Sequence, residues 1–599
     1  MIAVAQSSGP AAPALIAGKL CHAFRREKGP PVQALDGASL EVRHGELTAL
    51  IGPDGAGKTT LIRLAAGLLR ADSGTLKVLD VDVAVDPQRV QDRISYMPQR
   101  FGLYEDLTVA ENLDLYADLH GVTAEERAQR YPQLMDMTAL APFKQRLVGQ
   151  LSGGMKQKLG LACTLVRSPE LLILDEPTVG VDPLSRRELW EIVSHLVTDE
   201  GMTVLLSTAY LDEAERCSHV VLLHHGKVLS KGAPSDVTRY AEGLSFIVQS
   251  SHPGGARALQ AQLLDRPDII DAVPDGGRVR FVRVTEGQDV AATDELLRGL
   301  AVTPVPARFE DGFMMLLRRS ADREQVKVIA VDRPVHGDGQ SVMVKVRDLV
   351  KRFGDFVAVD HIDFEVRRGE IFGLLGPNGA GKTTTFRMLC GLLAASGGEL
   401  NISGTDVRRA PASARSHLGY VAQKFSLYGP LTVAENLEFF ASAYGLRGNL
   451  RRARIAWAMQ QFELGTHARV MSAQLPGGFK QRLAMAAALL HEPEILFLDE
   501  PTSGADPLAR RVFWRQITSL AEQGVTVIVT THFMQEAEYC DRVAIMDAGK
   551  LLGQGSPGDI RQRASTPATR EPSMEDAFIA IVQDARVEQA QAGSPKAAA

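Results

Sequence analysis

The stretch GPDGAGKTT, residues 52–60, decides the fold, because it matches the pattern GxxxxGK[ST] and returns as GPNGAGKTT at residues 376–384. Each copy lies between an apolar strand-like run and a helical run. Glycines in such a strand-to-helix loop allow backbone N–H groups to face phosphates at the start of the helix. The sequence therefore predicts two α/β domains of the P-loop NTPase class.

The region around this motif is repeated as a whole. LYEDLTVAENL at 103–113 returns at 427–437, and LDEPTVGVDPLSRR at 174–187 returns at 498–511, with the same offset of 324 residues. A chain of 599 residues is also too long for one hydrophobic core. We expect a disordered lead at 1–13, a first P-loop domain at 14–240, a small α+β linker domain at 243–340, a second P-loop domain at 343–562, and a closing helix with a disordered tail at 563–599, the tail starting at 589.

The composition excludes several classes of protein. The apolar share of 45%, the charged share of 23% and the net charge of −6 are typical of a globular protein and indicate no basic surface for nucleic acid. No run approaches the roughly 18 to 20 apolar residues of a membrane span, and the start lacks the pattern of a signal peptide. The five cysteines are scattered, which indicates free thiols in a reducing compartment. We therefore expect a cytoplasmic protein.

The linker segment, residues 243–340, is neither a charged coiled coil nor a flexible tether by composition. It holds 12 Lys or Arg against 14 Asp or Glu, and it alternates strand-like runs such as SFIVQ with helical runs such as ARALQAQLL and TDELLRGL. This pattern predicts the α+β linker domain. RFEDGFMMLL at 308–317 is echoed by SMEDAFIAIV at 573–582, so we expect an amphipathic helix to close each half.

The motifs supply side chains for phosphate chemistry. Lys58 and Lys382 would reach the β- and γ-phosphates of ATP, and the hydroxyls of Thr59 and Thr383 would bind Mg²⁺. We expect ATP contacts along both loops, from Gly52, Pro53, Asp54, Gly55, Ala56, Gly57, Lys58, Thr59 and Thr60, and from Gly376, Pro377, Asn378, Gly379, Ala380, Gly381, Lys382, Thr383 and Thr384.

Two acid pairs follow apolar runs that read as buried strands. Asp175 and Glu176 end ELLILDEP, and Asp499 and Glu500 end EILFLDEP. Ligands bind at the carboxyl ends of strands in a parallel sheet. The first acid of each pair would hold Mg²⁺ through water, and the second would orient and polarise the water that attacks the γ-phosphate.

Together with LSGGMKQ at 151–157, LPGGFKQ at 475–481 and TTH at 530–532, these motifs resemble the ATP-binding cassette (ABC) superfamily over essentially all of both repeats. The resemblance implies two cassettes, each with a helical subdomain, that pair head to tail. Each ATP then lies between the P-loop of one cassette and the LSGGQ-like signature of the other. The resemblance implies that the signatures contact ATP through Ser152, Gly153, Gly154, Gly477 and Gly478, and that His532 contacts the γ-phosphate. It implies that Gln99 and Gln423 link Mg²⁺ to the membrane partner, and that Asp182 and Asp506 lie in loops that cross the seam between the cassettes. It also implies that Phe24 and Phe353 stack on the adenine rings.

Two positions depart from the family pattern. Ala209 stands where the second repeat has His532, and Pro476 stands where the first repeat has Ser152. Proline is tolerated at the first position of a helix, but it removes a hydroxyl and an N–H. If the cassettes pair within one chain, both departures fall in the site of the first P-loop. We therefore expect that site to bind ATP as a clamp and the intact second site to hydrolyse it.

Within the superfamily the chain looks most similar to tandem-cassette ATPase subunits of exporters with ABC-2 type permeases, the multidrug and ion export group. The resemblance implies two separately encoded membrane subunits, a place on the cytoplasmic face of the inner membrane, and docking at Gln99, Gln423 and the segments 101–113 and 425–437. Two alternatives stay open. A tandem importer ATPase usually loses catalytic residues in one half, whereas Glu176 and Glu500 are both present. A soluble twin-cassette translation factor carries a long charged helical linker, which this chain lacks.

Overall fold

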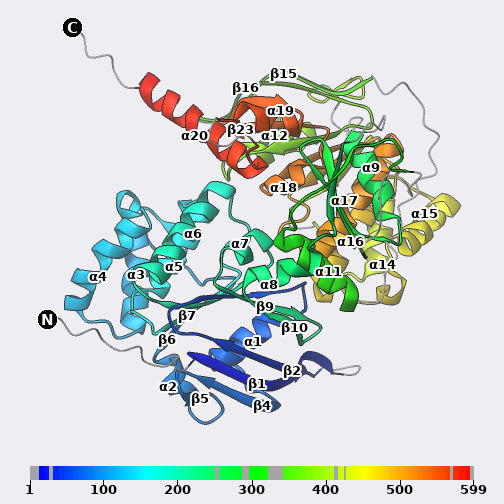
Figure 1. Ribbon diagram of the computed structural model, residues 1–599. Coiled ribbons are helices and arrows are strands. Elements are labelled where there is room, and N and C mark those ends of the chain that lie inside the picture. The colour runs from blue at the N-terminus through cyan, green and yellow to red at the C-terminus, as the bar shows by residue number, and fades with distance from the viewer. Residues whose placement is uncertain are drawn as a thin grey trace, which may run out of the picture.

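The structure is a computed structural model that describes residues 13–25, 31–249, 255–285, 296–320, 341–410, 416–423, 426–566 and 571–593. Figure 1 shows two α/β units, the first coloured blue to teal and the second yellow-green to red. The green segment that joins them in sequence lies beside helices of the second unit.

Each repeat contains a six-stranded sheet built around the P-loop strand. The order in the first repeat is β10-β9-β3-β8-β7-β6, and the second repeat gives the same order with β24, β23, β17, β22, β21 and β20. The central strands β3, β7 and β8 are parallel and fully buried, as continuous apolar runs predict. A four-stranded antiparallel sheet accompanies each, in the orders β2-β1-β4-β5 and β16-β15-β18-β19.

The bounds of the elements of the first repeat are as follows. The strands are β1 (Leu15–Phe24), β2 (Val32–Val42), β3 (Leu47–Ile51), β4 (Ser73–Val78), β5 (Val81–Asp82), β6 (Ile94–Met97), β7 (Leu171–Asp175), β8 (Thr203–Thr208), β9 (His219–His224) and β10 (Lys227–Gly232). The helices are α1 (Lys58–Ala65), α2 (Pro87–Gln91), α3 (Val109–Leu119), α4 (Ala124–Met137), α5 (Gly153–Thr164), α6 (Pro183–Thr198), α7 (Leu211–Glu215) and α8 (Pro234–Thr238), with short 3-10 turns η1 (Ala141–Phe143), η2 (Val148–Gln150) and η3 (Arg239–Ala241).

The second repeat has matching elements. The strands are β15 (Val342–Phe353), β16 (Phe356–Arg367), β17 (Ile371–Leu375), β18 (Gly397–Ile402), β19 (Thr405–Asp406), β20 (Leu418–Val421), β21 (Ile495–Asp499), β22 (Thr526–Thr531), β23 (Arg542–Asp547) and β24 (Lys550–Gly555). The helices are α12 (Lys382–Leu389), α14 (Val433–Ala443), α15 (Gly448–Gln461), α16 (Gly477–Leu489), α17 (Pro507–Glu522), α18 (Met534–Ala537), α19 (Pro557–Arg563) and α20 (Met574–Gly593), with η4 (Gly465–His467) and η5 (Ser472–Gln474).

A group of helices stands apart from the sheets in each repeat, α3 to α5 in the first and α14 to α16 in the second (Figure 1). Helices α3 and α14 begin at matching capping boxes, in which Thr108 pairs with Glu111 and Thr432 with Glu435. Such a box satisfies two backbone donors that a helix start otherwise leaves unpaired. The repeated LTVAENL segments thus start the same helix in both halves.

The linker segment forms its own small domain with a separate apolar core. Its sheet has the order β12-β13-β11-β14, made of β11 (Ser245–Gln249), β12 (Ile269–Asp275), β13 (Arg278–Arg283) and β14 (Val302–Pro304), and its helices are α9 (Gly255–Leu264) and α11 (Phe309–Ser320). The run 293–300, for which the sequence favours a helix, is a turn at 296–299, and 293–295 lie outside the described residues.

The linker domain is fastened to the second repeat by ion pairs. Arg511 of α17 contacts Asp271 at 3.2 Å, Arg515 contacts Asp265 at 2.6 Å, and Arg561 contacts Asp275 at 2.7 Å. Helix α11 packs against α7 and α8 of the first repeat. The linker domain therefore braces both repeats.

Helix α20 closes the second repeat, as the SMEDAFIAIV run predicts. It continues to Gly593, beyond position 589 where the sequence favours disorder, and an ion pair between Arg586 and Asp547 at 2.8 Å ties its second half to β23. The lead before residue 13 and the end after Gly593 lie outside the described residues.

Candidate nucleotide sites

The two P-loops turn into their helices in the same way. Gly57 and Gly381 precede α1 and α12 with φ of 106° and 100°. A Cβ at these positions would lie 2.4 Å from the carbonyl oxygen of Ala34 and 2.5 Å from that of Ala358. Only glycine avoids both the left-handed backbone penalty and these clashes. The glycine pattern thus fixes the loop shape that presents α1 and α12 to a ligand.

The P-loop lysines are buried and fold back on their own loops. The Nζ atoms of Lys58 and Lys382 donate to carbonyl oxygens of the first two loop residues at 2.6 to 3.3 Å. Burial lowers the pKa of Lys382, and the nearby carboxylates of Glu500, Asp182 and Asp499 oppose that shift. Each ammonium group is therefore held within the loop that is expected to bind phosphate.

The first acid of each pair ends a central strand. Asp175 accepts hydrogen bonds from the hydroxyls of Ser207 at 2.6 Å and Thr59 at 3.2 Å. Asp499 accepts one from Thr530 at 2.6 Å. The P-loop threonine and the strand-end aspartate thus come together in the first repeat, as the sequence predicts.

The second acid of each pair sits on strained backbone. Glu176 and Glu500 have φ of 50° and 47°, a region that non-glycine residues rarely adopt. Their N–H groups donate to the adjacent strand, and their carboxylates accept from the amides of Gln99 and Gln423 at 2.6 Å. Strain of this kind persists where the surroundings over-determine it, which is common at functional sites.

One neighbour distinguishes the two glutamates. His532 Nδ1 lies 3.2 Å from Glu500 Oε2, whereas Ala209 occupies the matching position beside Glu176. Burial raises the pKa of Glu176 above its usual value, although Lys58 opposes the shift. Burial also acts on Glu500, but the hydrogen bond and charge of His532, with Lys382 and Gln423, outweigh it and lower the pKa of Glu500. Glu500 is therefore held ionised more firmly than Glu176.

The second P-loop meets the first signature across the seam between the repeats. Asn378 Nδ2 donates to the carbonyl oxygen of Gly180 at 3.3 Å, and a Cβ on Gly153 would lie 3.4 Å from that same nitrogen. Ser152 caps α5 by accepting from Met155 N at 3.2 Å. The structure thus brings together the P-loop, acid pair and signature that the sequence assigns to the intact site.

The other signature is not closed on its P-loop in this way. A Cβ on Gly477 or Gly478 would meet no atom of the described chain within 4 Å. Pro476 is the N-cap of α16 and offers no side-chain cap. From the sequence we expect proline at the first helical position, which is one residue later. The first P-loop instead touches the opposite repeat through Asp54 N, which donates to Asp506 Oδ2 at 3.1 Å.

The comparisons with known proteins agree with this geometry. A family model described as "ABC transporter" matches residues 35–179 and 359–503. The "Probable multidrug ABC transporter ATP-binding protein YbhF" of Escherichia coli (strain K12) is 49% identical over 557 residues, which cover 93% of this chain and 95% of that protein. The chain belongs to the ATP-binding proteins of ABC transporters. It is an ABC ATPase with two cassettes in tandem.

Other relatives match one cassette. The "Nod factor export ATP-binding protein I" of Ralstonia nicotianae (strain ATCC BAA-1114 / GMI1000) is 40% identical over 228 residues, 38% of this chain and 71% of that protein. A solved structure titled "Structure of ATP binding subunit of ABC transporter" is 29% identical, with a TM-score of 0.37, covering 40% of this chain and 99% of its own. Within the described residues, no helix of this ABC ATPase is long and apolar enough to span a bilayer.

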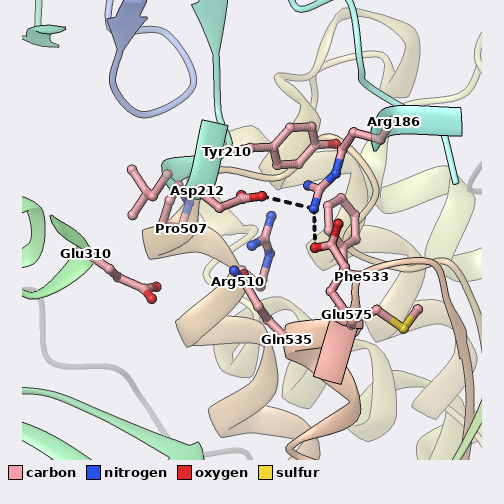
Figure 2. Close-up of a pocket in the computed structure, with 11 residues that line it drawn as sticks. Arg186, Tyr210, Asp212, Glu310, Pro507, Arg510, Phe533, Gln535 and Glu575 are labelled. Atoms are coloured by element: carbon pink, nitrogen blue, oxygen red, sulfur yellow. Dashed lines mark hydrogen bonds and ion pairs between the residues drawn. The ribbon is translucent and has the colours of Figure 1, made fainter. Parts of the chain in front are cut away.

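Sequence reasoning missed a cluster at the seam of the cassettes, which Figure 2 shows as the lining of a small pocket. Tyr210 and Phe533 directly follow the Ala209 and His532 positions, and their ring centres are 5.2 Å apart across the seam. Arg186 lies over Tyr210, and Arg510 lies over Phe533. The signal was present, because the repeat alignment places these rings and arginines at matched positions.

The closing helices contribute to the same cluster from the opposite halves. Arg186 of the first cassette binds Glu575 of α20 at 2.6 Å and Asp212 at 3.0 Å (Figure 2). Arg511 of the second cassette binds Glu310 of α11. The echoed acidic residues of the two closing helices thus cross-link the cassettes.

The candidate adenine-stacking aromatics lie at the ends of their first strands. Phe24 is 42% exposed and Phe353 is 50% exposed, so neither is a core residue. The Lys351 ammonium lies 4.9 Å from the Phe353 ring centre. An exposed ring face is what an adenine base would require.

Proposed function

We propose that this ABC ATPase drives export of small molecules through two separately encoded membrane subunits, with one hydrolytic ATP site and one degenerate site. The observation that carries the proposal is the complete second site. There the second P-loop faces Gly153 and Gly180 of the first cassette, while Glu500 is held by His532 and Gln423. Closure of the cassettes on ATP would then move the membrane subunits.

In the second site Glu500 would act as the base that orients and polarises the attacking water. Its lowered pKa keeps the carboxylate ionised, and Gln423 donates to it at 2.6 Å. His532 Nε2 is buried and has no hydrogen-bond partner within the described chain. A buried nitrogen without a partner is costly, so it suits an oxygen of the γ-phosphate. Lys382 would supply a further positive charge to the phosphates.

The residues present fit a magnesium ion. In the first cassette Thr59 Oγ1 lies 3.2 Å from Asp175 Oδ1. Mg²⁺ prefers hard oxygen ligands, and in nucleotide sites it typically binds one or two protein oxygens together with the phosphates. We propose that Thr59, Asp175 and Gln99 hold the ion in one cassette, and Thr383, Asp499 and Gln423 in the other. The ion neutralises charge on the phosphates when bound.

The first site would bind ATP as a clamp. Ala209 removes the histidine contact, and Pro476 removes the hydroxyl with which Ser152 caps α5 in the other signature. Glu176 also lacks the histidine neighbour that His532 supplies to Glu500. Lys58, Thr59 and Asp175 remain in place to hold the phosphates and the metal.

The membrane subunits would dock beside the glutamines. A cavity of about 190 Å³ opens next to β6 and α3, with Phe101 and Tyr116 among its lining residues. Tyr104 and Tyr428 are exposed at matching positions of the two cassettes, while 424 and 425 lie outside the described residues. Such aromatics are typical of interface anchors. We propose ABC-2 type permeases as the partner class, which is compatible with the export named for the relatives. The chain would then lie on the cytoplasmic face of the inner membrane.

Affinity purification of the chain from membranes in mild detergent tests this proposal. We expect two ABC-2 type permease subunits to co-purify and to raise ATP turnover in the recovered complex. Recovery of an import permease would contradict export, and sedimentation with ribosomes in place of membranes would contradict transport altogether. The mixed α+β linker domain makes the ribosomal outcome the less expected one.

A further inference from the structure

The two P-loops differ at one residue between their first and last glycines. Asp54 stands in the first loop where Asn378 stands in the second. Asn378 uses its side-chain amide as a donor across the seam, to the Gly180 carbonyl at 3.3 Å. An ionised Asp54 has no side-chain donor, and only its backbone N–H reaches across, to Asp506 Oδ2 at 3.1 Å. The two loops therefore contact the opposite cassette through different groups.

A second difference explains why Asp506 is free to make this contact. In the matching aspartate, Asp182, both carboxylate oxygens accept hydrogen bonds from its own cassette. The donors are the N–H of Ser185 at 3.1 Å and the hydroxyl of Ser185 at 3.0 Å. In the second cassette Ala509 replaces Ser185, so the hydroxyl donor is missing and Asp506 Oδ1 accepts the Ala509 N–H at 3.0 Å. The remaining oxygen of Asp506 points to the first P-loop.

The result is an excess of negative charge beside the first P-loop. Burial and the charge of Asp506 raise the pKa of Asp54 to about 6, against the opposing charge of Lys58, so the carboxyl is largely ionised at pH 7. Glu176 also raises the pKa of Asp54, but Glu500 is its counterpart in the second cassette, so the charge that the first loop carries in excess is that of Asp54. Burial lowers the pKa of His224, a neighbour of Asp506, so this side chain adds no compensating positive charge. The second loop carries a neutral amide at the same position and has His532 nearby.

We propose that Asp54, facing Asp506 across the seam, is a specificity-determining residue that lowers the preference of the first site for ATP over ADP. This inference rests on the proposed pairing of the cassettes within one chain. The γ-phosphate adds one negative charge to the bound magnesium nucleotide and is expected at this seam, so the extra carboxylate of Asp54 acts against ATP more than against ADP. Together with Ala209 and Pro476, Asp54 makes the first site a clamp that keeps either nucleotide while the second site turns over.

A charge swap between the two loops tests the inference. The affinities for labelled ATP and labelled ADP are measured by equilibrium dialysis in the presence of Mg²⁺. Lys382→Ala is used to isolate the first site, and Lys58→Ala to isolate the second. In the first background Asp54→Asn should raise the ratio of ATP affinity to ADP affinity about tenfold, the size expected for one unit charge several ångströms away at an intermediate dielectric. In the second background Asn378→Asp should lower that ratio by a similar factor.

Two further variants test the role of Asp506 and supply a control. Asp506→Asn should raise the first-site ratio as well, and its effect should not add to that of Asp54→Asn, because the charge of Asp506 acts on the Asp54 carboxyl. Asp92→Asn, an exposed change of the same charge just after α2, should shift the ratio less than about twofold and serves as the control. A purely structural role of Asp54 would change both affinities together and leave the ratio unmoved.

The outcomes separate the inference from the function on which it rests. Unchanged ratios in both the Asp54→Asn and Asn378→Asp arms would overturn the inference. A shift with Asp54→Asn and none with Asp506→Asn would overturn the cross-seam pairing and with it the within-chain site. Loss of all nucleotide binding in one background only would remove the nucleotide site that the proposed function requires there.

Discussion

Glu176 and Glu500 occupy the same place in the two cassettes, on the same strained backbone and with the same glutamine partner, yet their pKa values move in opposite directions. The difference comes from one side chain, because His532 lies beside Glu500 and Ala209 lies beside Glu176. Two near-identical scaffolds therefore place the same carboxylate in different electrostatic surroundings.

The seam shows the same asymmetry in its packing. A Cβ on Gly154 would lie 2.2 Å from the hydroxyl of Ser185, so the first signature is packed tightly against α6. The matching Gly478 faces open space, and the matching α17 residue is Ala509, which lacks the hydroxyl. The two halves have diverged at the residues that meet across and beside the seam, while their strands and P-loops have kept the same geometry.

Removing the two bases should give the largest difference. Glu500→Gln should lower steady-state phosphate release by about 100-fold or more, the range of a general base, because it neutralises the ionised carboxylate of the intact site. Glu176→Gln should change it by less than about twofold. The two variants are matched controls for each other. Equal losses in the complex with the membrane subunits would break the comparison.

Substituting matched arginines on α6 and α17 should lower the stability of the two halves by different amounts. Arg511→Met should destabilise the second cassette by about 3 kcal/mol, since it leaves Asp271 buried, and Glu310 partly buried, without their partner. Arg187→Met, the matching change, removes an exposed ion pair with Glu191 at 3.7 Å and should cost less than about 1 kcal/mol. Scanning calorimetry measures both, and similar shifts in Tm would contradict a bracing role for the linker domain.

Repairing the first site should give a smaller gain. In the Glu500→Gln background, Pro476→Ser combined with Ala209→His should raise ATP turnover about tenfold, a change of about 1.4 kcal/mol in the barrier. Each single change should do less than half of this in free energy, because both groups would contact one γ-phosphate. A double variant that binds ATP at both sites and shows no gain would mean that other residues, Asp54 among them, disable the site.

Substitutions on the proposed docking surface should have similar effects in the two cassettes. Tyr104→Asp and Tyr428→Asp should each weaken recruitment to permease-containing membranes by roughly fivefold, about 1 kcal/mol for a lost aromatic anchor. Tyr240→Asp, on the exposed face of η3, is the control and should have little effect. Membrane flotation measures the bound fraction, with ATP binding checked for each variant. Recruitment unchanged by both substitutions would remove these tyrosines from the docking surface.

Short-range patterns in the sequence were sufficient for the fold and for much of the sites. The P-loop lysines, the acid pairs and the glutamines each follow from a motif whose spacing places them at strand ends or helix starts. In the structure Thr59 lies within hydrogen-bond distance of Asp175, and the glutamines within that distance of Glu176 and Glu500. The substitutions at Ala209 and Pro476 were also visible, because a repeat supplies its own reference at every position.

Only the tertiary structure decided how the halves engage. The contacts of Asn378 with Gly180 and of Asp54 with Asp506, and the ion pair of Arg511 with Asp271, join residues 198, 452 and 240 positions apart. No local pattern encodes such pairs, because each depends on how whole domains pack. The opposite pKa shifts of Glu176 and Glu500 likewise depend on burial and on neighbours brought in by other strands, so the motif determined which groups are present and the packing determined their charge.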